Sequence, residues 1–213
     1  MIDIFDKINF IVFEGIDCSG KTTIINELSK IIYDIYNKNN KQRDIYITKE
    51  PTEDSIFGRR LVEHLNNKIL DSNKELEFYI EDRNIHIKNI LYRKNNFNSL
   101  CLCDRFNLST LVYQSTFNDF SIQYIKNKID IMLDNNLIPC VTFILDISLE
   151  TYLKRIKYRK DISIYEKDID KIEIMKEKYI ELVDCHKNIF LINANQKVNK
   201  IIDNILQIFL NFF

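Results

Sequence analysis

Residues 15–22 read Gly-Ile-Asp-Cys-Ser-Gly-Lys-Thr, which fits the phosphate-binding pattern G-x-x-x-x-G-K-[ST]. The chain has only three glycines in 213 residues, and two of them, Gly15 and Gly20, occupy the fixed glycine positions of this pattern. The apolar run at 8–13 favours a buried strand, and the apolar spacing over 23–36 favours a helix. A loop that joins a strand to a helix N-terminus presents backbone N–H groups to phosphate oxygens. The sequence therefore predicts a phosphate-binding loop.

Two side chains of this loop have specific expected tasks. Lys21 is expected to reach the β- and γ-phosphates of a nucleotide, and the Thr22 hydroxyl to ligate Mg²⁺. The other residues expected to contact the nucleotide here are Gly15, Ile16, Asp17, Cys18, Ser19, Gly20 and Thr23.

Composition limits the remaining classes of function. The chain suits a single domain over residues 1–213, with 46% apolar and 29% charged residues and a net charge of −1. Nothing in this balance suggests a nucleic-acid or membrane partner. No apolar stretch approaches the roughly 20 residues that span a bilayer, and residues 1–7 lack a signal-peptide pattern. We expect a cytoplasmic protein.

Cysteine and histidine offer no metal site in the sequence. The five cysteines are an odd number and lack zinc-ligand spacing, so buried free thiols are expected. Cys101 and Cys103 are two residues apart in a strand-like run and should face the same side of it. No chemistry is assigned to His64, His86 or His186.

Strand-like and helix-like segments alternate along the whole chain. Strands are expected at 8–13, 44–48, 99–103, 140–145 and 188–192, and helices at 23–36, 56–70, 74–95, from about 107, 121–136, 148–158, 166–186 and 196–211. Continuously apolar strands in such an order predict an α/β fold, in which a five-stranded parallel sheet lies between two layers of helices. The carboxyl ends of the strands should carry the site. Polar clusters fall there, at 17–22, 49–51, 104–105 and 193–195.

Two further groups of residues suit a nucleotide site. Asp104 follows the third strand and could hold Mg²⁺, and Arg105 beside it offers paired donors to a phosphate. On the helix that follows, Thr110 and Gln114 are four residues apart and share a face.

Tyr79 and Arg83 share a helical face in the same way, as an aromatic stacker beside a cation. Two structural alternatives remain open. Tyr79 could be a core aromatic, with Phe78 beside it in either role, and Arg83 could pair at the surface with Glu77 or Asp82.

Four elements occur in the order of one known family. Residues 104–114 match Asp-Arg-Tyr-x-x-Ser-Ser-x-x-Tyr-Gln, with Phe106 and Thr110 as mild changes. Residues 48–51 (Thr-Lys-Glu-Pro) correspond to the motif Thr-Arg-Glu-Pro of that family. Residues 79–83 correspond to its Phe-x-x-x-Arg, and residues 193–195 to its Asp-Ala-Asn/Asp. Over nearly its whole length the chain resembles the thymidylate kinases of bacteria and archaea.

The resemblance implies a P-loop nucleoside monophosphate kinase fold and phosphorylation of dTMP to dTDP by ATP and Mg²⁺, by a homodimer. It implies that Tyr79 stacks on thymine and that Arg83 and Gln114, with Thr110, hold the base and the 5′-phosphate end. It places Ala194 beside adenine and lets Arg105 bridge the phosphates of both substrates. The implied acceptor residues are Asp17, Glu50, Tyr79, Arg83, Arg105, Thr110, Tyr113 and Gln114, the catalytic residues Lys21, Arg105, Arg159 and Asp17, and the metal ligands Thr22 and Asp104.

The basic run at 153–160 lies where such kinases carry a mobile lid, expected here at about 154–166. Because Cys18 stands where relatives have Arg or Gly, Arg159 is expected to stabilise the transferring phosphoryl group, with Arg155 as second choice. The chain departs from the family at Val62, where an Arg usually touches the base edge, and the register of Arg59 and Arg60 differs.

Two other classes were weighed against this interpretation. Residues 127–130 spell the guanine-reading Asn-Lys-x-Asp, but they lie in a helix-like stretch and no Asp-x-x-Gly element follows the third strand. A motor or assembly ATPase would need a longer chain. Among kinases, another nucleoside monophosphate kinase remains the alternative.

Overall fold

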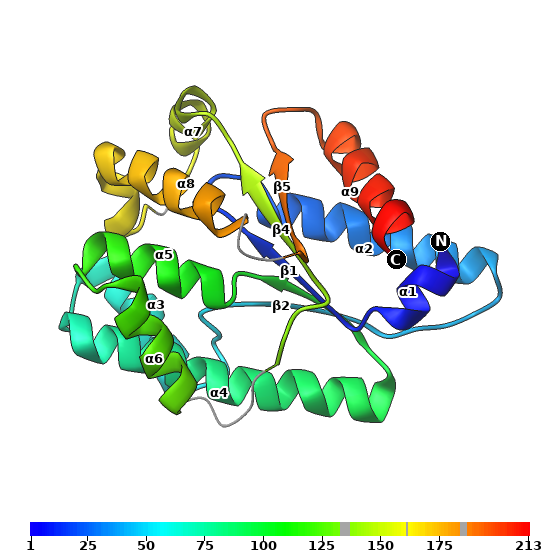
Figure 1. Ribbon diagram of the computed structural model, residues 1–213, viewed down its shortest axis with the longest axis horizontal. Coiled ribbons are helices and arrows are strands. Elements are labelled where there is room, and N and C mark those ends of the chain that lie inside the picture. Colours follow the sequence, from blue (N-terminus) through cyan, green and yellow to red (C-terminus); the bar gives the residue numbers. More distant parts are fainter. Residues whose placement is uncertain (133–136, 161, 184–186) are drawn as a thin grey trace.

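The computed structural model describes residues 1–132, 137–160, 162–183 and 187–213. Within them, five strands form one parallel sheet in the order β2-β3-β1-β4-β5 (Figure 1). The strands are β1 (Phe10–Glu14), β2 (Ile45–Lys49), β3 (Leu100–Asp104), β4 (Val141–Asp146) and β5 (Ile189–Asn193). Each strand begins one or two residues after the start of the expected apolar run. The predicted five-stranded parallel sheet is confirmed.

Helices cover both faces of this sheet. They are α1 (Ile2–Lys7), α2 (Lys21–Lys38), α3 (Ile56–Asn67), α4 (Ser72–Phe97), α5 (Asn107–Phe117), α6 (Ile122–Met132), α7 (Leu149–Ile156), the 3₁₀ helix η1 (Ile164–Lys167), α8 (Ile169–Val183) and α9 (Val198–Phe212). Figure 1 shows α1, α2 and α9 on one side of the sheet and α4, α5 and α8 on the other. The predicted three-layer α/β/α architecture is therefore confirmed. Residues 133–136 and 184–186, at the ends of two expected helices, lie outside the described residues.

Two helical segments differ from expectation. Helix α1 was not predicted, because six residues give too little periodicity to recognise. It is held by Phe5, whose buried ring packs edge to face on Phe209 of α9, with the ring centroids 5.0 Å apart. The expected helix at 166–186 is interrupted, since Ser163 and Glu166 form a capping box that closes the separate turn η1 before α8 begins.

The sheet brings the expected polar clusters to one edge. In the register of β1, β3 and β2, Phe13 and Lys49 both lie beside Asp104. Backbone bonds continue past the strand ends, since the Arg105 N–H donates to the Phe13 carbonyl and the Glu50 N–H to the Asp104 carbonyl, each at 2.9 Å. Parallel strands therefore fix residues 14–17, 49–51 and 104–105 next to one another.

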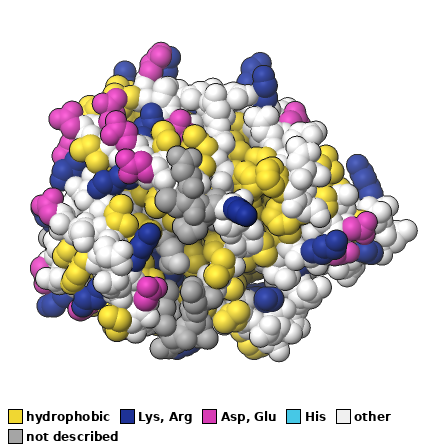
Figure 2. Space-filling model, in the orientation of Figure 1, with side chains coloured by type: hydrophobic (Ala, Val, Ile, Leu, Met, Phe, Trp, Pro, Cys, Tyr) yellow, Lys and Arg dark blue, Asp and Glu magenta, His cyan; other side chains and the backbone are white. Residues whose placement is uncertain are grey.

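The surface carries mixed charge. Figure 2 shows acidic and basic side chains intermixed on one face, most densely over the end of the molecule that carries α5 and α8. In the part of the chain that the structure describes, no helix has the length and apolar character to cross a membrane.

Candidate active site

The loop between β1 and α2 depends on its two glycines. Gly15 and Gly20 have φ of 129° and 98°, in the region that favours glycine. A Cβ on Gly15 would also lie 2.6 Å from the carbonyl oxygen of Leu145. Gly20 is the N-cap of α2, so the loop ends where the first N–H groups of a helix are free to bind an anion.

Lys21 lies across this loop. Its ammonium donates to the carbonyls of Gly15 (3.1 Å) and Ile16 (3.0 Å) and is 4.0 Å from the Asp104 carboxylate. Burial lowers the pKa of Lys21, and the nearby Arg105 acts in the same direction. The loop residues from Asp17 to Ile24 line a wide cavity, which we call the phosphate cavity, and Lys21 is among them.

Thr22 and Asp104 form the pair expected to ligate a metal. The Thr22 hydroxyl donates to Asp104 Oδ2 at 2.8 Å, and both residues line the phosphate cavity. Among the described residues no group of three or more His, Cys, Asp or Glu could hold a metal. Two protein oxygens beside a phosphate site nevertheless fit Mg²⁺, which usually takes one or two protein ligands together with phosphate and water.

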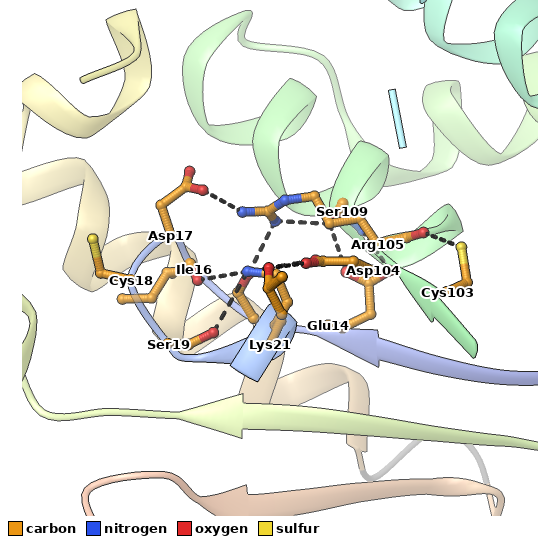
Figure 3. A network of polar contacts seen from close by, with 12 residues as sticks. Glu14, Ile16, Asp17, Cys18, Ser19, Lys21, Cys103, Asp104, Arg105 and Ser109 are labelled. Carbon is orange, nitrogen blue, oxygen red and sulfur yellow. Dashed lines mark hydrogen bonds and ion pairs between the residues drawn. The ribbon is translucent and has the colours of Figure 1, made fainter. Parts of the chain in front are cut away.

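Arg105 connects the loop to α5 (Figure 3). Its guanidinium donates to Asp17 Oδ1 (2.8 Å), the Tyr113 hydroxyl (3.0 Å), the Gly15 carbonyl (3.0 Å) and Ser109 Oγ (3.1 Å). The Tyr113 hydroxyl in turn donates to Asp17 Oδ2 at 3.0 Å. Loop, strand end and helix thus place a carboxylate, a guanidinium and a phenol in one cluster.

Charge keeps Asp17 ionised in this cluster. Burial alone would raise its pKa, but the cations of Arg105, Lys21 and Arg159 outweigh burial and hold the pKa of Asp17 well below its usual range.

Glu14 supports the cluster and was missed by the sequence analysis. Its fully buried carboxylate accepts the N–H groups of Phe106 (2.8 Å) and Ser109 (3.1 Å) at the start of α5, and the Ser109 hydroxyl. Burial raises the pKa of Glu14, although Ser109 and Arg105 oppose the shift. The signal that could have found it is a carboxylate at the end of an otherwise apolar strand.

A second cavity, which we call the acceptor cavity, adjoins the first. Most residues expected to bind the acceptor nucleotide line it: Asp17, Glu50, Tyr79, Arg83, Arg105, Thr110 and Tyr113. The rest of its described wall consists of Pro51, Leu65, Ser109, Arg159, Ser163, Tyr165 and Glu166. The sequence assigns no individual role to Leu65, Ser163, Tyr165 or Glu166, although the last three lie within the lid expected at about 154–166.

Arg83 is a buried member of the wall, held by several hydrogen bonds. It is 1% exposed, and its Nε and NH2 donate to Glu50 Oε2 at 2.9 and 2.6 Å. NH2 also donates to Thr110 Oγ1 (2.8 Å) and the Phe106 carbonyl (3.1 Å), whereas NH1 is buried and has no partner among the described residues. The pairing alternative with Glu77 or Asp82 is therefore replaced by a buried pair with Glu50.

Glu50 is held from its other side by a histidine. His86 Nδ1 lies 2.8 Å from Glu50 Oε1, and His86 Nε2 lies 2.8 Å from Thr48 Oγ1. Burial would raise the pKa of Glu50, but Arg83 and then His86 outweigh it and lower the pKa.

Gln114 and Val62 do not line the acceptor cavity. Gln114 is completely buried behind the wall, where its amide donates to Glu75 at 2.7 Å. From α3 only the apolar Leu65 reaches the described lining, while Arg59 donates to the carbonyls of Glu53 and Asp54 and Arg60 pairs with Glu63.

Arg155, in the last turn of α7, and Arg159, just after this helix, differ in their contacts. Arg159 pairs with Glu166 Oε1 and lies 3.5 Å from Asp17 Oδ1, so its cation faces the junction of the two cavities. Arg155 donates to the backbone carbonyls of Cys18 (3.0 Å), Ser19 (3.1 Å) and Ala194 (3.0 Å). Arg155 therefore braces the loop against the end of β5, where Ala194 is buried.

The described histidines and cysteines lie in the packed structure and form no metal site with one another. His64 and His86 are buried beside carboxylates, and Cys101 and Cys103 are buried free thiols on one side of β3. Cys18 and Cys140 are free thiols that are only half-buried, so the expected burial is wrong for these two. His186 lies outside the described residues, as does Cys185. Residues 127–130 lie within α6, as the rejection of a guanine-reading loop requires.

Comparison with known proteins agrees with this geometry. The family model described as thymidylate kinase matches residues 13–205. A thymidylate kinase of Ligilactobacillus salivarius is 31% identical over 95% of this chain and 98% of its own length. A probable thymidylate kinase of Sulfolobus acidocaldarius is 32% identical over the same shares. The crystal structure of thymidylate kinase from Ehrlichia chaffeensis superposes with a TM-score of 0.69 at 24% identity, over 94% of this chain and 97% of that one. That likeness confirms the P-loop nucleoside monophosphate kinase fold. The chain belongs to the thymidylate kinase family.

Proposed function

We propose that this protein transfers the γ-phosphoryl group of ATP to the 5′-phosphate of dTMP and so forms dTDP and ADP. The observation that carries the proposal is that the phosphate cavity and the acceptor cavity share four lining residues, Asp17, Glu50, Arg105 and Arg159. Two sites that meet at two guanidinium groups and two carboxylates suit transfer of an anionic group from one ligand to another.

The residues that line the acceptor cavity suit the binding of a nucleotide. In this proposal Tyr79 stacks its ring on thymine, and Arg83, which lines the same cavity, donates to a carbonyl oxygen of the base. Thr110 holds Arg83 in place. Asp17 and Tyr113, which contact each other in the lining, would bind the sugar in this proposal, and Gln114 would support the wall through Glu75.

Catalysis rests on position and charge. Lys21 neutralises the donor phosphates, Arg105 bridges the phosphates of donor and acceptor, and Arg159 stabilises the charge that spreads over the transferring group. Thr22 and Asp104 would hold Mg²⁺, which supplies further charge neutralisation at the β- and γ-phosphates. Asp17 fixes Arg105 and Arg159 from one side, so both cations point at the shared region.

The segment at about 154–166 acts as a lid in this proposal. It carries Arg159 and Glu166 over the junction, and its rearrangement would admit and release nucleotides. Family membership also supports a homodimer in the cytoplasm, which light scattering and fluorescence imaging of a tagged chain would test.

A nucleotide panel tests the proposed reaction. ADP release is followed with ATP and Mg²⁺ against dTMP, dUMP, dCMP, dGMP and AMP, and the products are identified by chromatography. We expect the highest kcat/KM with dTMP and no ADP release without an acceptor. A preference for another monophosphate would replace dTMP by that substrate, and release without any acceptor would contradict the kinase proposal.

A further inference from the structure

Glu75 is a buried carboxylate that the proposed reaction does not use. It lies in the first turn of α4, one helical turn before Tyr79, and is 2% exposed. A carboxylate removed from water is costly unless several donors satisfy it. The groups around it therefore indicate what this carboxylate holds together.

Among the described residues, four side chains contact the Glu75 carboxylate. Gln114 of α5 donates at 2.7 Å, Asn118 after α5 donates at 2.9 Å, and the Tyr165 hydroxyl of η1 donates to the same oxygen as Gln114. His64 of α3 places its Nε2 3.3 Å from Glu75 Oε2. Because His64 Nδ1 accepts the Leu70 N–H at 2.9 Å, the proton of the neutral ring is on Nε2, the nitrogen that faces Glu75.

Tyr165 differs from the other three partners because it belongs to the segment between α7 and α8. Its ring lies on Phe117 with the centroids 4.4 Å apart and meets Tyr113 edge to face at 5.6 Å. Burial raises the pKa of Tyr165, so the phenol keeps its proton and is the donor to Glu75. The bond thus joins η1 to the wall of the acceptor cavity.

The next residue carries this attachment to Arg159. Glu166 accepts the Ser163 N–H at 2.7 Å with Oε2 and pairs with Arg159 through Oε1. Fixing Tyr165 therefore fixes the backbone that places Glu166, and Glu166 orients the guanidinium that faces Asp17.

We propose that the hydrogen bond from Tyr165 to Glu75 is a latch that holds η1 against α4 and α5, so that both residues position Arg159 at the junction of the two cavities. The positioning part rests on the proposed role of Arg159 in phosphoryl transfer. The latch itself is a property of the free protein and does not depend on which nucleotide is bound.

Tyr165→Phe tests the latch, because it keeps the ring packing and removes only the donor hydroxyl. We expect amide hydrogen exchange over 162–167 in the nucleotide-free protein to become about tenfold faster, as for the loss of one hydrogen bond to a charged group. The matched control for exchange is Tyr158→Phe, the same change at a phenol 90% exposed in the same segment. Unchanged exchange over 162–167 in Tyr165→Phe, or a rise spread equally over the sheet, would overturn the latch.

A double-mutant cycle with Glu75→Gln assigns the effect to the pair. Tyr165→Phe should change exchange less in the Glu75→Gln background than in the wild type, and additive effects would overturn the pairing. If Glu75→Gln does not fold, Tyr165→Phe alone still decides the latch. For the positioning part, kcat with the preferred acceptor should fall several-fold in Tyr165→Phe, with a smaller change in acceptor KM. Faster exchange with unchanged kcat would overturn the positioning role, and neither result alters the acceptor preference that the nucleotide panel measures.

Discussion

Arg83 and Glu50 form an ion pair across the floor of the acceptor cavity, with NH2 and Oε2 2.6 Å apart and both side chains at most 4% exposed. The pair fixes the guanidinium plane, because Nε and NH2 share one carboxylate oxygen. NH1 is buried and has no partner among the described residues, while Arg83 as a residue lines the acceptor cavity. One ion pair thus fixes a residue that the proposed function assigns to nucleotide binding.

The stability lost on replacing Glu50 should depend on pH in a defined window. The pKa of Glu50 is lowered in the folded protein, so its stabilisation is present above the ordinary glutamate pKa and is lost as pH falls through the folded value. At pH 7, Glu50→Gln leaves Arg83 buried without a counter-ion and should lower the free energy of unfolding by about 3–5 kcal/mol. Urea unfolding at pH 7, 5, 4 and 3 measures the difference.

Below about pH 4 this difference should shrink, since a protonated Glu50 resembles glutamine. Glu53→Gln is the control, because Glu53 is exposed and its pairing with Lys49 lies at the surface. A wild-type advantage that stayed constant from pH 7 to pH 3 would contradict the assigned pairing.

Arg83→Lys should separate binding from turnover. Lysine keeps the charge but lacks the planar fork, so it cannot hold Glu50 and donate to a base at the same time. We expect the KM for dTMP to rise about 10- to 100-fold, as for the loss of a charged hydrogen bond, and kcat to change less.

The matched control for that variant is Arg93→Lys, because Arg93 is exposed on the same helix. An Arg83→Lys enzyme with normal dTMP affinity and a normal melting temperature would remove Arg83 from the acceptor site.

Lys21→Ala should lower kcat by orders of magnitude in a folded protein, because it removes a buried charge aimed at the transferring group. Lys30→Ala, on the exposed side of the same helix α2, should leave turnover unchanged. Steady-state kinetics with circular dichroism of each variant checks both activity and fold. Near-normal turnover in folded Lys21→Ala would refute the kinase proposal.

The sequence predicted the parts of the fold and site that depend on local pattern. Strands with continuous apolar runs and the glycines of the loop are such parts, and the parallel sheet then brought Asp17, Arg105 and Glu50 together. The partner of Arg83 could not be predicted, because Glu50 is 33 residues away and the pair forms only when α4 packs against the end of β2. The burial of Gln114 depends in the same way on Glu75 from another helix.

Replacing Arg159 and replacing Arg155 by alanine should have different effects on activity and stability. Arg159 faces Asp17 and Glu166 at the junction, so Arg159→Ala should reduce kcat more than it weakens dTMP binding. Arg155 holds three backbone carbonyls around the loop, so Arg155→Ala should raise the KM for ATP and lower the melting temperature. Isothermal titration measures the dTMP affinity of both variants, and steady-state kinetics measures their kcat and their KM for ATP.

Lys160→Ala serves as the control, since Lys160 is exposed next to Arg159. Collapse of dTMP affinity with intact turnover in Arg159→Ala would move Arg159 to the acceptor site.

The base pocket should prefer dTMP but reject dUMP only moderately. The described lining that the proposal assigns to the base consists of Tyr79, the apolar Leu65 and Pro51, and Arg83, while Val62 contributes no polar group. Apolar walls recognise the thymine methyl group through contact alone, which is worth about 1–3 kcal/mol, or roughly 10- to 200-fold. Tyr79→Ala removes stacking that both bases share, so it should lower kcat/KM for dTMP and dUMP by a similar factor. Tyr92→Ala, at an exposed tyrosine of the same helix, controls for loss of a ring on α4. If Tyr79→Ala abolished the discrimination between dTMP and dUMP and left activity with dUMP intact, Tyr79 would read the methyl group rather than stack on the base.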